Sequence, residues 1–543
     1  MSAEPADLVI LADRVHTMDS SGAAPTAVAV RDGEIVRVAD HAEALSLVGT
    51  STRVIDGPGL VVTPGLVDSH QHPVLGLGQQ RGINLSAARD IDQLRALLAA
   101  ERARLADGDW LVGYGVDYDL FREAPPHRSM IDPAVGDHPT WLWLADLHTV
   151  LLSTAALTRT GLTGPVKFAD HASVVVDATG APTGQLHEMS AISLAHPALP
   201  EPDLAETARR LEDLFAAQNR CGITAAHVPD FWTGTSELLS HLESEDRLTM
   251  RLHVAPWVRA GEVLDSIGEA VELRESRSGM GSLWTTSAVK LFLDGTIDGG
   301  SAWLTHADCH GESTRAMWLD PREYVDAVHK AVGAGFSCWT HAIGDAASSW
   351  ALSAYERAGR PAGGRHRIEH LEVLKDSDVA RFACLDVVAS MQPTHMDWSQ
   401  PDHSDNWSTR LGPDRCGRAW RHRDLLAAGA TVAFGSDWPI ADFDPRVVIA
   451  GAQLRRPVAE PGRAPYVVDQ AVTAMQALAA FTTGAARAAA EEDVGGRVRT
   501  GHRADLTVFT GDPIDCPPDH LPRLPVAATV VAGRIVYADA GFA

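Results

Sequence analysis

Short hydrophobic runs alternate with amphipathic runs over most of the 543-residue chain, and this alternation predicts the fold. The amphipathic runs repeat apolar positions every three or four residues, as helices do, for example at 203–219, 321–333 and 346–358. The hydrophobic runs are short and rich in β-branched residues, which is typical of buried strands. Eight of them follow one another: 62–68, 223–228, 251–258, 287–293, 336–341, 367–373, 387–392 and 431–435. Eight strands alternating with helices indicate an α/β protein of the (β/α)8, TIM-barrel type.

Both ends of the chain carry a different pattern, in which short strands are separated by glycine turns. They occur in residues 1–62, where Asp32-Gly33 is typical of a β-hairpin, and again in residues 486–543. Neither group is large enough to bury its own sheet faces, so we expect the two to combine into one small β-sandwich. The barrel would then occupy residues 63–485, between the two parts of that sandwich.

One connection is too long to be an ordinary barrel loop. Residues 76–201 separate the first predicted strand from the helix before the second, and such a length requires structure of its own. A helix-like run at 91–105, the aromatic pair Trp141 and Trp143 and a strand-like run at 173–176 predict a compact insertion. Because it leaves from the carboxyl end of a strand, we expect a lid or wall over the barrel mouth.

Composition and charge restrict the class of partner. With 45% hydrophobic and 22% charged residues, the chain has a globular composition, and its net charge of −25 disfavours nucleic acid and anionic membranes. The N-terminus lacks the pattern of a signal peptide, and no stretch approaches the ~20 apolar residues of a membrane span. The six cysteines lack Cys-x-x-Cys spacing, which fits reduced thiols. We expect a cytoplasmic protein that acts on a small molecule, and we leave a homodimer open.

Polar residues stand at the carboxyl ends of five predicted strands, where the active sites of TIM barrels lie. These residues are His70, His72, Lys290, His341, His370 and Asp437. His70 and His72 are two positions apart, so their side chains point to the same side of a strand. Imidazole and carboxylate groups suit Zn²⁺ or a similar divalent ion, so the set predicts a metal site. Taken singly, Lys290 could be a surface lysine and His341 a core histidine.

Motifs that contain these residues resemble the amidohydrolase superfamily, and more narrowly its amidohydrolase-3 branch of YtcJ-like and N-substituted formamide deformylase-like proteins. The resemblance covers almost the whole chain and departs from the branch at Leu293, where a small residue is more usual. Its motifs are Pro64-Gly-Leu-Val-Asp-Ser-His-x-His72, Pro182-Thr-Gly-Gln-Leu-His-Glu188, Val289-Lys-Leu-Phe-Leu-Asp-Gly295, His341-Ala-Ile-Gly-Asp345, His366-Arg-Ile-Glu-His370, Ser390-Met-Gln-Pro393, Gly435-Ser-Asp-Trp-Pro439 and Gly501-His-Arg-Ala-Asp-Leu-Thr-Val508.

The resemblance implies a centre with two divalent ions, most often Zn. His70, His72 and Asp437 would hold one ion, and His341 and His370 the other. Lys290, carboxylated by CO₂, would bridge the two ions as an anionic ligand; a single ion beside an unmodified Lys290 is the alternative. A metal-bound hydroxide would attack a carbonyl group, and Asp437 would accept a proton and pass it to the leaving amine.

The expected reaction is hydrolysis of a non-peptide C–N bond in a small amide, formamide or cyclic amide. An aminohydrolase (deaminase) or an ester or lactone hydrolase would use the same site, and a non-catalytic scaffold is disfavoured because no ligand is missing. Tryptophans such as Trp303, Trp318 and Trp339 fall in or next to loops of the predicted mouth, where basic residues are scarce. We therefore expect a neutral, aryl-bearing substrate. Further candidates for substrate contact are Glu188, Trp303, His395 and Trp438.

Four acidic residues near the predicted ligands have supporting roles in this interpretation. We expect Asp345 and Glu369, which flank ligand histidines, to orient the imidazoles through their second nitrogen. We expect Asp294 and Asp298 to shape the loop after the fourth strand rather than to bind metal.

Overall fold

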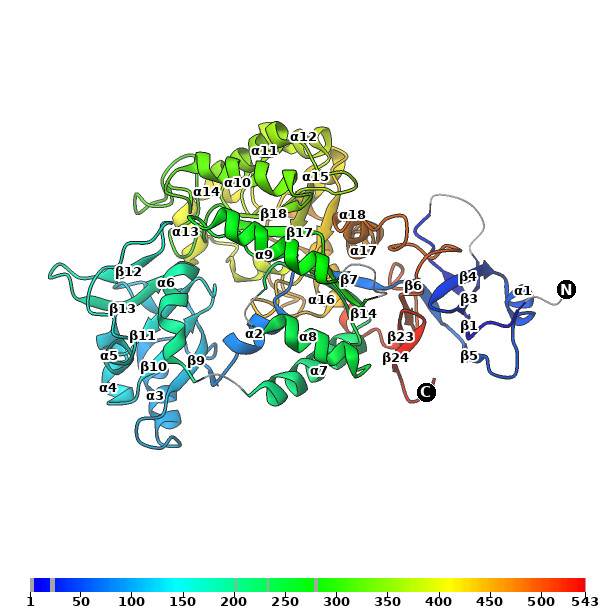
Figure 1. The fold of residues 1–543 in the computed structure, drawn as a ribbon, viewed down its shortest axis with the longest axis horizontal. Coiled ribbons are helices and arrows are strands. Elements are labelled where there is room, and N and C mark those ends of the chain that lie inside the picture. Colours follow the sequence, from blue (N-terminus) through cyan, green and yellow to red (C-terminus); the bar gives the residue numbers. More distant parts are fainter. Residues whose placement is uncertain (1–3, 20–24, 201–202, 232–233, 278–281, 543) are drawn as a thin grey trace.

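The structure is a computed structural model that describes residues 4–19, 25–200, 203–231, 234–277 and 282–542. Glu201, the last residue assigned to the predicted insertion, lies outside these ranges. Figure 1 shows the insertion at one end of the molecule and the strands of both chain ends at the other, with the strand–helix units between them. Among the described residues, no helix combines the length and the apolar character that crossing a membrane requires.

The central region contains two sheets of parallel strands, which confirms the expected α/β class. One sheet has the order β16-β15-β14-β7 and the other the order β17-β18-β19-β20-β21. The strands are β7 (Leu66–Asp68), β14 (Ile223–Val228), β15 (Arg251–Val254), β16 (Trp284–Thr286), β17 (Ala288–Phe292), β18 (Ser337–Ala342), β19 (Arg367–His370), β20 (Val388–Met391) and β21 (Val432–Phe434). Every residue of β14, β18, β19, β20 and β21 is buried, as expected for parallel strands covered on both faces.

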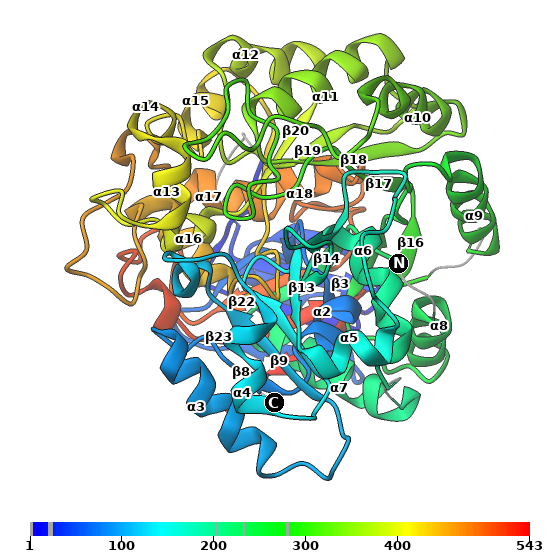
Figure 2. The ribbon, with the colours of Figure 1, turned by 90° about the vertical axis from the view of Figure 1, so that its left-hand side faces the viewer.

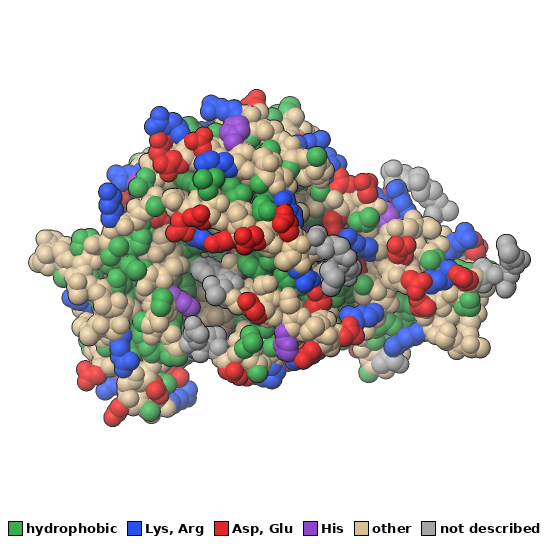
Figure 3. Space-filling model, viewed as in Figure 1, with side chains coloured by type: hydrophobic (Ala, Val, Ile, Leu, Met, Phe, Trp, Pro, Cys, Tyr) green, Lys and Arg blue, Asp and Glu red, His purple; other side chains and the backbone are tan. Residues whose placement is uncertain are grey.

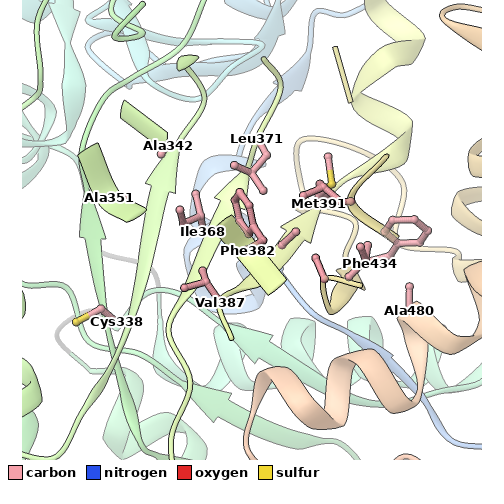
Figure 4. Close-up of a cluster of buried hydrophobic side chains, with 14 of the residues drawn as sticks. Cys338, Ala342, Ala351, Ile368, Leu371, Phe382, Val387, Met391, Phe434 and Ala480 are labelled. Atoms are coloured by element: carbon pink, nitrogen blue, oxygen red, sulfur yellow. The ribbon is translucent and has the colours of Figure 1, made fainter. Parts of the chain in front are cut away.

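Helices cover the outside of these strands, as Figure 2 shows for α8 to α12. They are α7 (Leu204–Arg220), α8 (Thr235–Ser244), α9 (Val263–Ser276), α10 (Pro321–Gly333), α11 (Asp345–Ala358), α12 (Asp376–Leu385), α13 (Asn406–Leu411), α14 (Pro413–Cys416), α15 (His422–Ala427), α16 (Pro445–Leu454), α17 (Ala474–Phe481) and α18 (Thr483–Ala488). Their apolar faces and the strands form one large core, in which Phe382 of α12 packs among Ile368, Val387 and Met391 (Figure 4). Burying such side chains holds helices and strands in fixed positions.

Backbone hydrogen bonds also join the two parallel sheets to each other at both edges. The amide of Lys290 in β17 donates to Pro256 O at 2.8 Å, just beyond the end of β15. At the other edge, the amide of Asp437 donates to His70 O at 2.7 Å, and the amide of Ser69 donates to Phe434 O at 3.0 Å. The ends of β7 and β21, which carry predicted ligands, are therefore held side by side.

The first predicted strand, 62–68, is divided between two sheets. Its first part is β6 (Val61–Pro64), which joins a sheet of the chain ends, and its second part is β7. Gly65 separates them where the backbone packs closely, since a Cβ there would lie 2.2 Å from Thr224 Oγ1. The change of sheet was not visible in the hydrophobic pattern, because both parts are mainly apolar and mainly buried. β6 also spans the predicted domain boundary between residues 62 and 63.

The two chain ends share one sheet and one hydrophobic cluster. The sheet β2-β6-β22-β23-β24 combines β2 (Arg14–Val15) and β6 with β22 (Leu506–Phe509), β23 (Val526–Val531) and β24 (Arg534–Ala538). The cluster joins this sheet to a second one, β4-β3-β1-β5, of the N-terminal segment. The latter contains β1 (Leu8–Leu11), β3 (Ala27–Arg31), β4 (Glu34–Ala39) and β5 (Arg53–Asp56), and α1 (His41–Leu45) packs against it. That these sheets form a single β-sandwich domain stays a prediction.

The insertion has its own six-stranded sheet, of order β12-β13-β11-β10-β9-β8. The strands are β8 (Ile83–Asn84), β9 (Leu111–Val116), β10 (Thr140–Leu144), β11 (Thr149–Leu152), β12 (Ser173–Val176) and β13 (Pro182–His187), and the helices around them are α3 (Ile91–Arg102), α4 (Asp132–Val135), α5 (Thr154–Thr160) and α6 (Glu188–Ala195). The preceding helix, α2 (Pro73–Gln79), packs against α7 instead. Trp141 and Trp143 pack inside the insertion with Leu186 and Ile192. These two tryptophans therefore belong to its core and do not line a substrate site.

Candidate metal centre and substrate pocket

The six predicted ligand residues line one pocket, although up to 367 positions separate them in the sequence. Its volume is about 300 Å³. All of the ligands lie on parallel strands or just after them, so the pocket opens at the carboxyl ends of β7, β17, β18, β19 and β21. They are His70, His72, Lys290, His341, His370 and Asp437.

Polar contacts fix the two strand ends that carry His70 and Asp437. Asp68 Oδ1 accepts from the amide of His70 at 3.1 Å and from the amide of Ser436 at 3.0 Å, and Asp68 Oδ2 accepts from Ser436 Oγ at 2.5 Å. Gly435 allows the close approach, because a Cβ there would lie 2.5 Å from the amide nitrogen of His70. The φ angles of His370 and Asp437 are +74° and +59°. Such backbone strain is typical of functional positions that the surrounding structure determines.

Carboxylates orient the two histidines of β7. His70 Nδ1 donates to Glu369 Oε2 at 2.6 Å, and His72 Nδ1 donates to Asp230 Oδ2 at 2.6 Å. This is the arrangement that fixes the tautomer of metal-binding histidines and leaves Nε2 free to coordinate. Glu369 has the orienting role expected from the sequence, whereas Asp230, just after β14, was not singled out there.

Uncharged oxygens orient the other two histidines. His370 Nδ1 donates to Gln392 Oε1 at 3.0 Å, and His341 Nε2 donates to Gly295 O at 3.2 Å. Their rings lie together, with centroids 4.4 Å apart. Within the described ranges no hydrogen bond joins the Asp345 side chain to either ring, and its Oδ1 accepts from the amide of Thr305 at 2.7 Å instead.

Several of the remaining ligand atoms converge, and two of them have no hydrogen-bond partner in the described part of the chain. Atoms of His70, His370 and Asp437 lie within 4.8 Å of one another. Asp437 Oδ1 is 3.3 Å from His70 Nε2 and 3.1 Å from His72 Nε2. Both His70 Nε2 and Asp437 Oδ1 are buried, and neither forms a hydrogen bond within the described part of the chain. Buried polar atoms are costly when unpaired, so this donor set fits a divalent cation.

The sequence model described as "Amidohydrolase family" matches residues 53–537. The chain belongs to the amidohydrolase family. It is 29% identical to YtcJ of Bacillus subtilis (strain 168), over 96% of this chain and 98% of YtcJ. It is 25% identical to an N-substituted formamide deformylase of Arthrobacter pascens, over 98% of this chain and 99% of that enzyme.

The fold of this amidohydrolase resembles that of an uncharacterized metal-dependent hydrolase from Pyrococcus horikoshii. The TM-score is 0.72 at 23% identity, with 94% of this chain and 99% of that chain covered. Together with the family, the site agrees with a hydrolase that acts on carbon–nitrogen bonds.

The charges in the pocket favour ligand-ready protonation states at four of the predicted ligands of this amidohydrolase. His72 differs, because burial alone would lower its pKa but Asp230 and Asp437 outweigh burial and raise the pKa to about 9. Burial lowers the pKa values of His70, His341 and His370 well below the usual range, and nearby Lys290 contributes to each. Burial alone would raise the pKa of Asp437, but the facing histidines outweigh it and lower the pKa to about 2. Neutral imidazoles and an ionised carboxylate are the forms that bind metal.

Lys290 is almost completely buried, and burial lowers its pKa to about 8. Its Nζ lies 4.8 Å from the centroid of the Phe292 ring. Among the described residues, no carboxylate comes within ion-pair distance of this nitrogen. A surface lysine was the ordinary alternative, and the burial of Lys290 excludes it.

Of the four candidates for substrate contact, the structure places one in the pocket lining and three outside it. His395 lines the pocket, with its Nε2 3.6 Å from Asp437 Oδ2. Glu188 lies behind the wall, where its Oε2 accepts from His148 Nδ1 at 2.7 Å. Trp303 lines a separate cavity beside Trp350. The ring of Trp438 is buried among the side chains around α7 and β14 and is not part of the pocket lining.

The aromatic wall consists mainly of residues that the sequence interpretation did not single out. Trp257, Phe231 and Trp398 line the pocket with Phe292. Trp318 and Trp339, which were expected near the mouth, are buried in the core instead. Tryptophans near a strand end can point into the core or the pocket, and only the tertiary structure decides between these positions.

The pocket also contains polar residues from the insertion and from the loop after β17. They are Asp146, His148, Thr296 and Asp298. Burial raises the pKa of Asp298 to about 8, although a hydrogen bond from Asn406 acts to lower it. Asp294 lies behind them and accepts hydrogen bonds from the amides of Trp303, Ile343 and Gly344, so it shapes its loop as expected.

Proposed function

We propose that this amidohydrolase hydrolyses the non-peptide C–N bond of a small, neutral, aryl-bearing amide, formamide or cyclic amide. The convergence of buried, unpaired His70 Nε2 and Asp437 Oδ1 is the observation that carries the proposal. The name of the Arthrobacter pascens relative supports a formamide or a related amide. The aromatic lining by Phe231, Trp257 and Trp398 supports an aryl group.

Two divalent ions, most readily Zn²⁺, complete the proposed site. His70, His72 and Asp437 would hold one ion, His341 and His370 the other, and a carboxylated Lys290 would bridge them. When bound, such ions polarise a carbonyl group and lower the pKa of water so that it becomes a nucleophile near neutral pH. The donor types and the name of the Pyrococcus horikoshii hydrolase support a divalent metal.

The lowered pKa of Lys290 supports its carboxylation, because only the uncharged amine reacts with CO₂. The carbamate formed would be anionic and would carry two oxygen ligands. An ammonium ion at the same place would be repelled by two dications. A single ion beside an unmodified Lys290 is the alternative, and metal analysis separates the two.

Residues of the chain supply proton transfer and exclusion of water. Asp437 would take the proton of the attacking water on a carboxylate oxygen and pass it to the leaving nitrogen. His395 would contact the substrate beside it. The aromatic wall would exclude bulk water, which strengthens electrostatic interactions within the pocket.

The arrangement of the sheets supports a closed (β/α)8 barrel as the framework of this site. The hydrogen bonds at both edges of the two parallel sheets would close the ring, between β15 and β17 and between β21 and β7. In such a barrel the ligands meet at the carboxyl end, where TIM-barrel active sites lie. We propose that the barrel extends over residues 63–485 and that the two chain ends form one composite β-sandwich.

Metal analysis and a substrate panel test the proposed function. We expect about two equivalents of divalent metal per chain and release of an amine from neutral aryl amides or formamides. Absence of metal binding, or hydrolysis confined to aryl esters, lactones or exocyclic amino groups of heterocycles, would contradict it. Chelator-treated protein, assayed before and after addition of Zn²⁺, provides the control.

A further inference from the structure

His148 is an imidazole in the pocket wall that belongs to the insertion and not to the parallel sheets. It lies between β10 and β11, and its ring centroid is 5.1 Å from that of His341. Its Nδ1 donates to Glu188 Oε2 at 2.7 Å, while the amide of Glu188 donates to His148 O at 2.8 Å. The two residues, 40 positions apart, are thus joined by one side-chain and one backbone hydrogen bond.

Glu188 is held firmly enough to act as the anchor of this pair. Its carboxylate is buried, and Oε1 accepts a hydrogen bond from Ser301 Oγ at 2.7 Å. The φ angle of Glu188 is +67°, which is strained for a residue with a side chain. Gly295 makes room for the carboxylate, because a Cβ there would lie 2.1 Å from Glu188 Oε1. Gly295 O also accepts from His341 Nε2, so one loop positions both histidines.

The free nitrogen of His148 is the part available to a ligand. Nδ1 is occupied by Glu188, and no hydrogen bond involves Nε2 among the residues that the structure describes. His148 lines the same pocket as the predicted metal ligands. An imidazole fixed by a buried carboxylate presents its Nε2 in one orientation, as in catalytic and metal-binding histidines.

We propose that His148 is a catalytic residue supplied by the insertion, and that its Nε2 hydrogen bonds to the amide group of the substrate beside the metal centre. Glu188 and Ser301 are positioning residues, because they act through His148. An amide offers both a carbonyl acceptor and an N–H donor. Nε2 therefore has a partner on the substrate both in the neutral ring, where it accepts, and in the protonated ring, where it donates. This proposal rests on the proposed function, and it gives the insertion a chemical role beyond covering the pocket.

Replacing His148 in the full-length, metal-loaded protein tests the proposal. We expect His148→Gln to lower kcat by about 10²-fold, the loss typical of removing one hydrogen bond to a reacting amide, with a much smaller change in KM. Glu188→Gln should give a smaller loss, because the imidazole remains but is less well fixed. Bound metal should stay at the wild-type level in both variants.

His187→Gln is the matched control. His187 precedes Glu188 on β13, its Nε2 lies 3.0 Å from Gln185 Oε1, and it is not part of the pocket lining. This variant should retain wild-type kcat and KM. Added imidazole should restore part of the kcat of His148→Gly, which a merely structural role would not produce.

A binding measurement separates failure of this proposal from failure of the proposed function. Acetohydroxamate, an amide analogue with metal-binding oxygens, is titrated calorimetrically into metal-loaded wild type, His148→Gln and His187→Gln. We expect the first variant alone to bind about 10-fold more weakly, as for one lost hydrogen bond. Equal affinities, or loss of metal from His148→Gln, would overturn the proposal. A wild type that hydrolyses no amide would refute the proposed function, while these affinities would still decide the role of His148.

Discussion

The buried ion pair behind His70 offers a test that links stability to metal binding. Glu369 accepts from His70 Nδ1 through Oε2 and from Arg367 Nε through Oε1. Both side chains of the pair are completely buried, and Arg367 also stacks on Trp339, 3.5 Å from the ring centroid. Glu369→Gln preserves the volume and removes the negative charge, so the guanidinium of Arg367 becomes an uncompensated buried cation.

The expected loss of stability is large. Removing one partner of a buried ion pair costs about 3–5 kcal/mol. The entropy of unfolding is about 2.1 cal/mol/K per residue near 60 °C. If residues 63–485 unfold together, the loss corresponds to a fall in Tm of about 3–6 °C. The variant should also bind metal about 10–100-fold more weakly, because His70 loses the carboxylate that fixes its tautomer.

Scanning calorimetry of chelator-treated protein measures the first effect, and competition with a metal-binding dye measures the second. Glu356→Gln is the matched control, since Glu356 forms an exposed ion pair with Arg381 at 3.1 Å. Exposed pairs contribute about 0–1 kcal/mol, so its Tm should change by about 1 °C or less. If Glu369→Gln equals the control in Tm and retains wild-type metal affinity, the reasoning from the buried pair is refuted.

Three further predictions concern the metal centre and the substrate. Lys290→Ala should lose metal and activity, partly restored by added acetate, and full metal occupancy without acetate would contradict the bridging role. Asp437→Asn should retain much of the metal, because four histidines remain, while kcat falls by about 10²–10⁴-fold; near-wild-type turnover of metal-loaded protein would place proton transfer elsewhere. Neutral aryl amides should exceed N-acyl amino acids in kcat/KM, since Arg259 in the lining already pairs with Glu262, and the reverse order would refute a neutral-substrate pocket.

The sequence predicted the parallel strands well because they are buried on both faces. Runs such as 223–228 are mainly apolar, and the structure has the fully buried β14 over the same residues. The division of 62–68 at Gly65 was missed, because a change of sheet leaves hydrophobicity unchanged. The strand-end rule placed six ligand residues around one pocket, since the carboxyl ends of parallel strands meet at one edge of their sheets.

Other residues that reach the site could not be predicted from a sequence pattern of this kind. His148 lies between two antiparallel strands of the insertion, and no motif or spacing connects it with His341. Asp230 follows β14 by two residues, where its contact with His72 depends on the order of strands in the sheet. The tryptophans show the same limit. Trp257 follows β15 and lines the pocket, whereas Trp339 lies within β18 and packs in the core.

The surface of the molecule agrees with recognition inside a pocket. On the face shown in Figure 3, acidic and basic side chains are interspersed over the described residues, and no extended basic patch is visible there. A net charge of −25 also disfavours polyanionic partners. Discrimination between ligands would therefore depend on the pocket wall.

Two structural elements with different constraints build that pocket. The predicted strand-end ligands His70 and Asp437 are fixed by hydrogen bonds between β7 and β21, so a change there would disturb the sheets as well as the proposed metal centre. His148 and Asp146 belong to the insertion, whose sheet has its own hydrophobic core. Substitutions in the insertion can alter the pocket wall while the two parallel sheets retain their hydrogen bonds. Differences in substrate among proteins with the same strand-end ligands should therefore be sought first in the insertion, because catalytic groups can change there without loss of the fold.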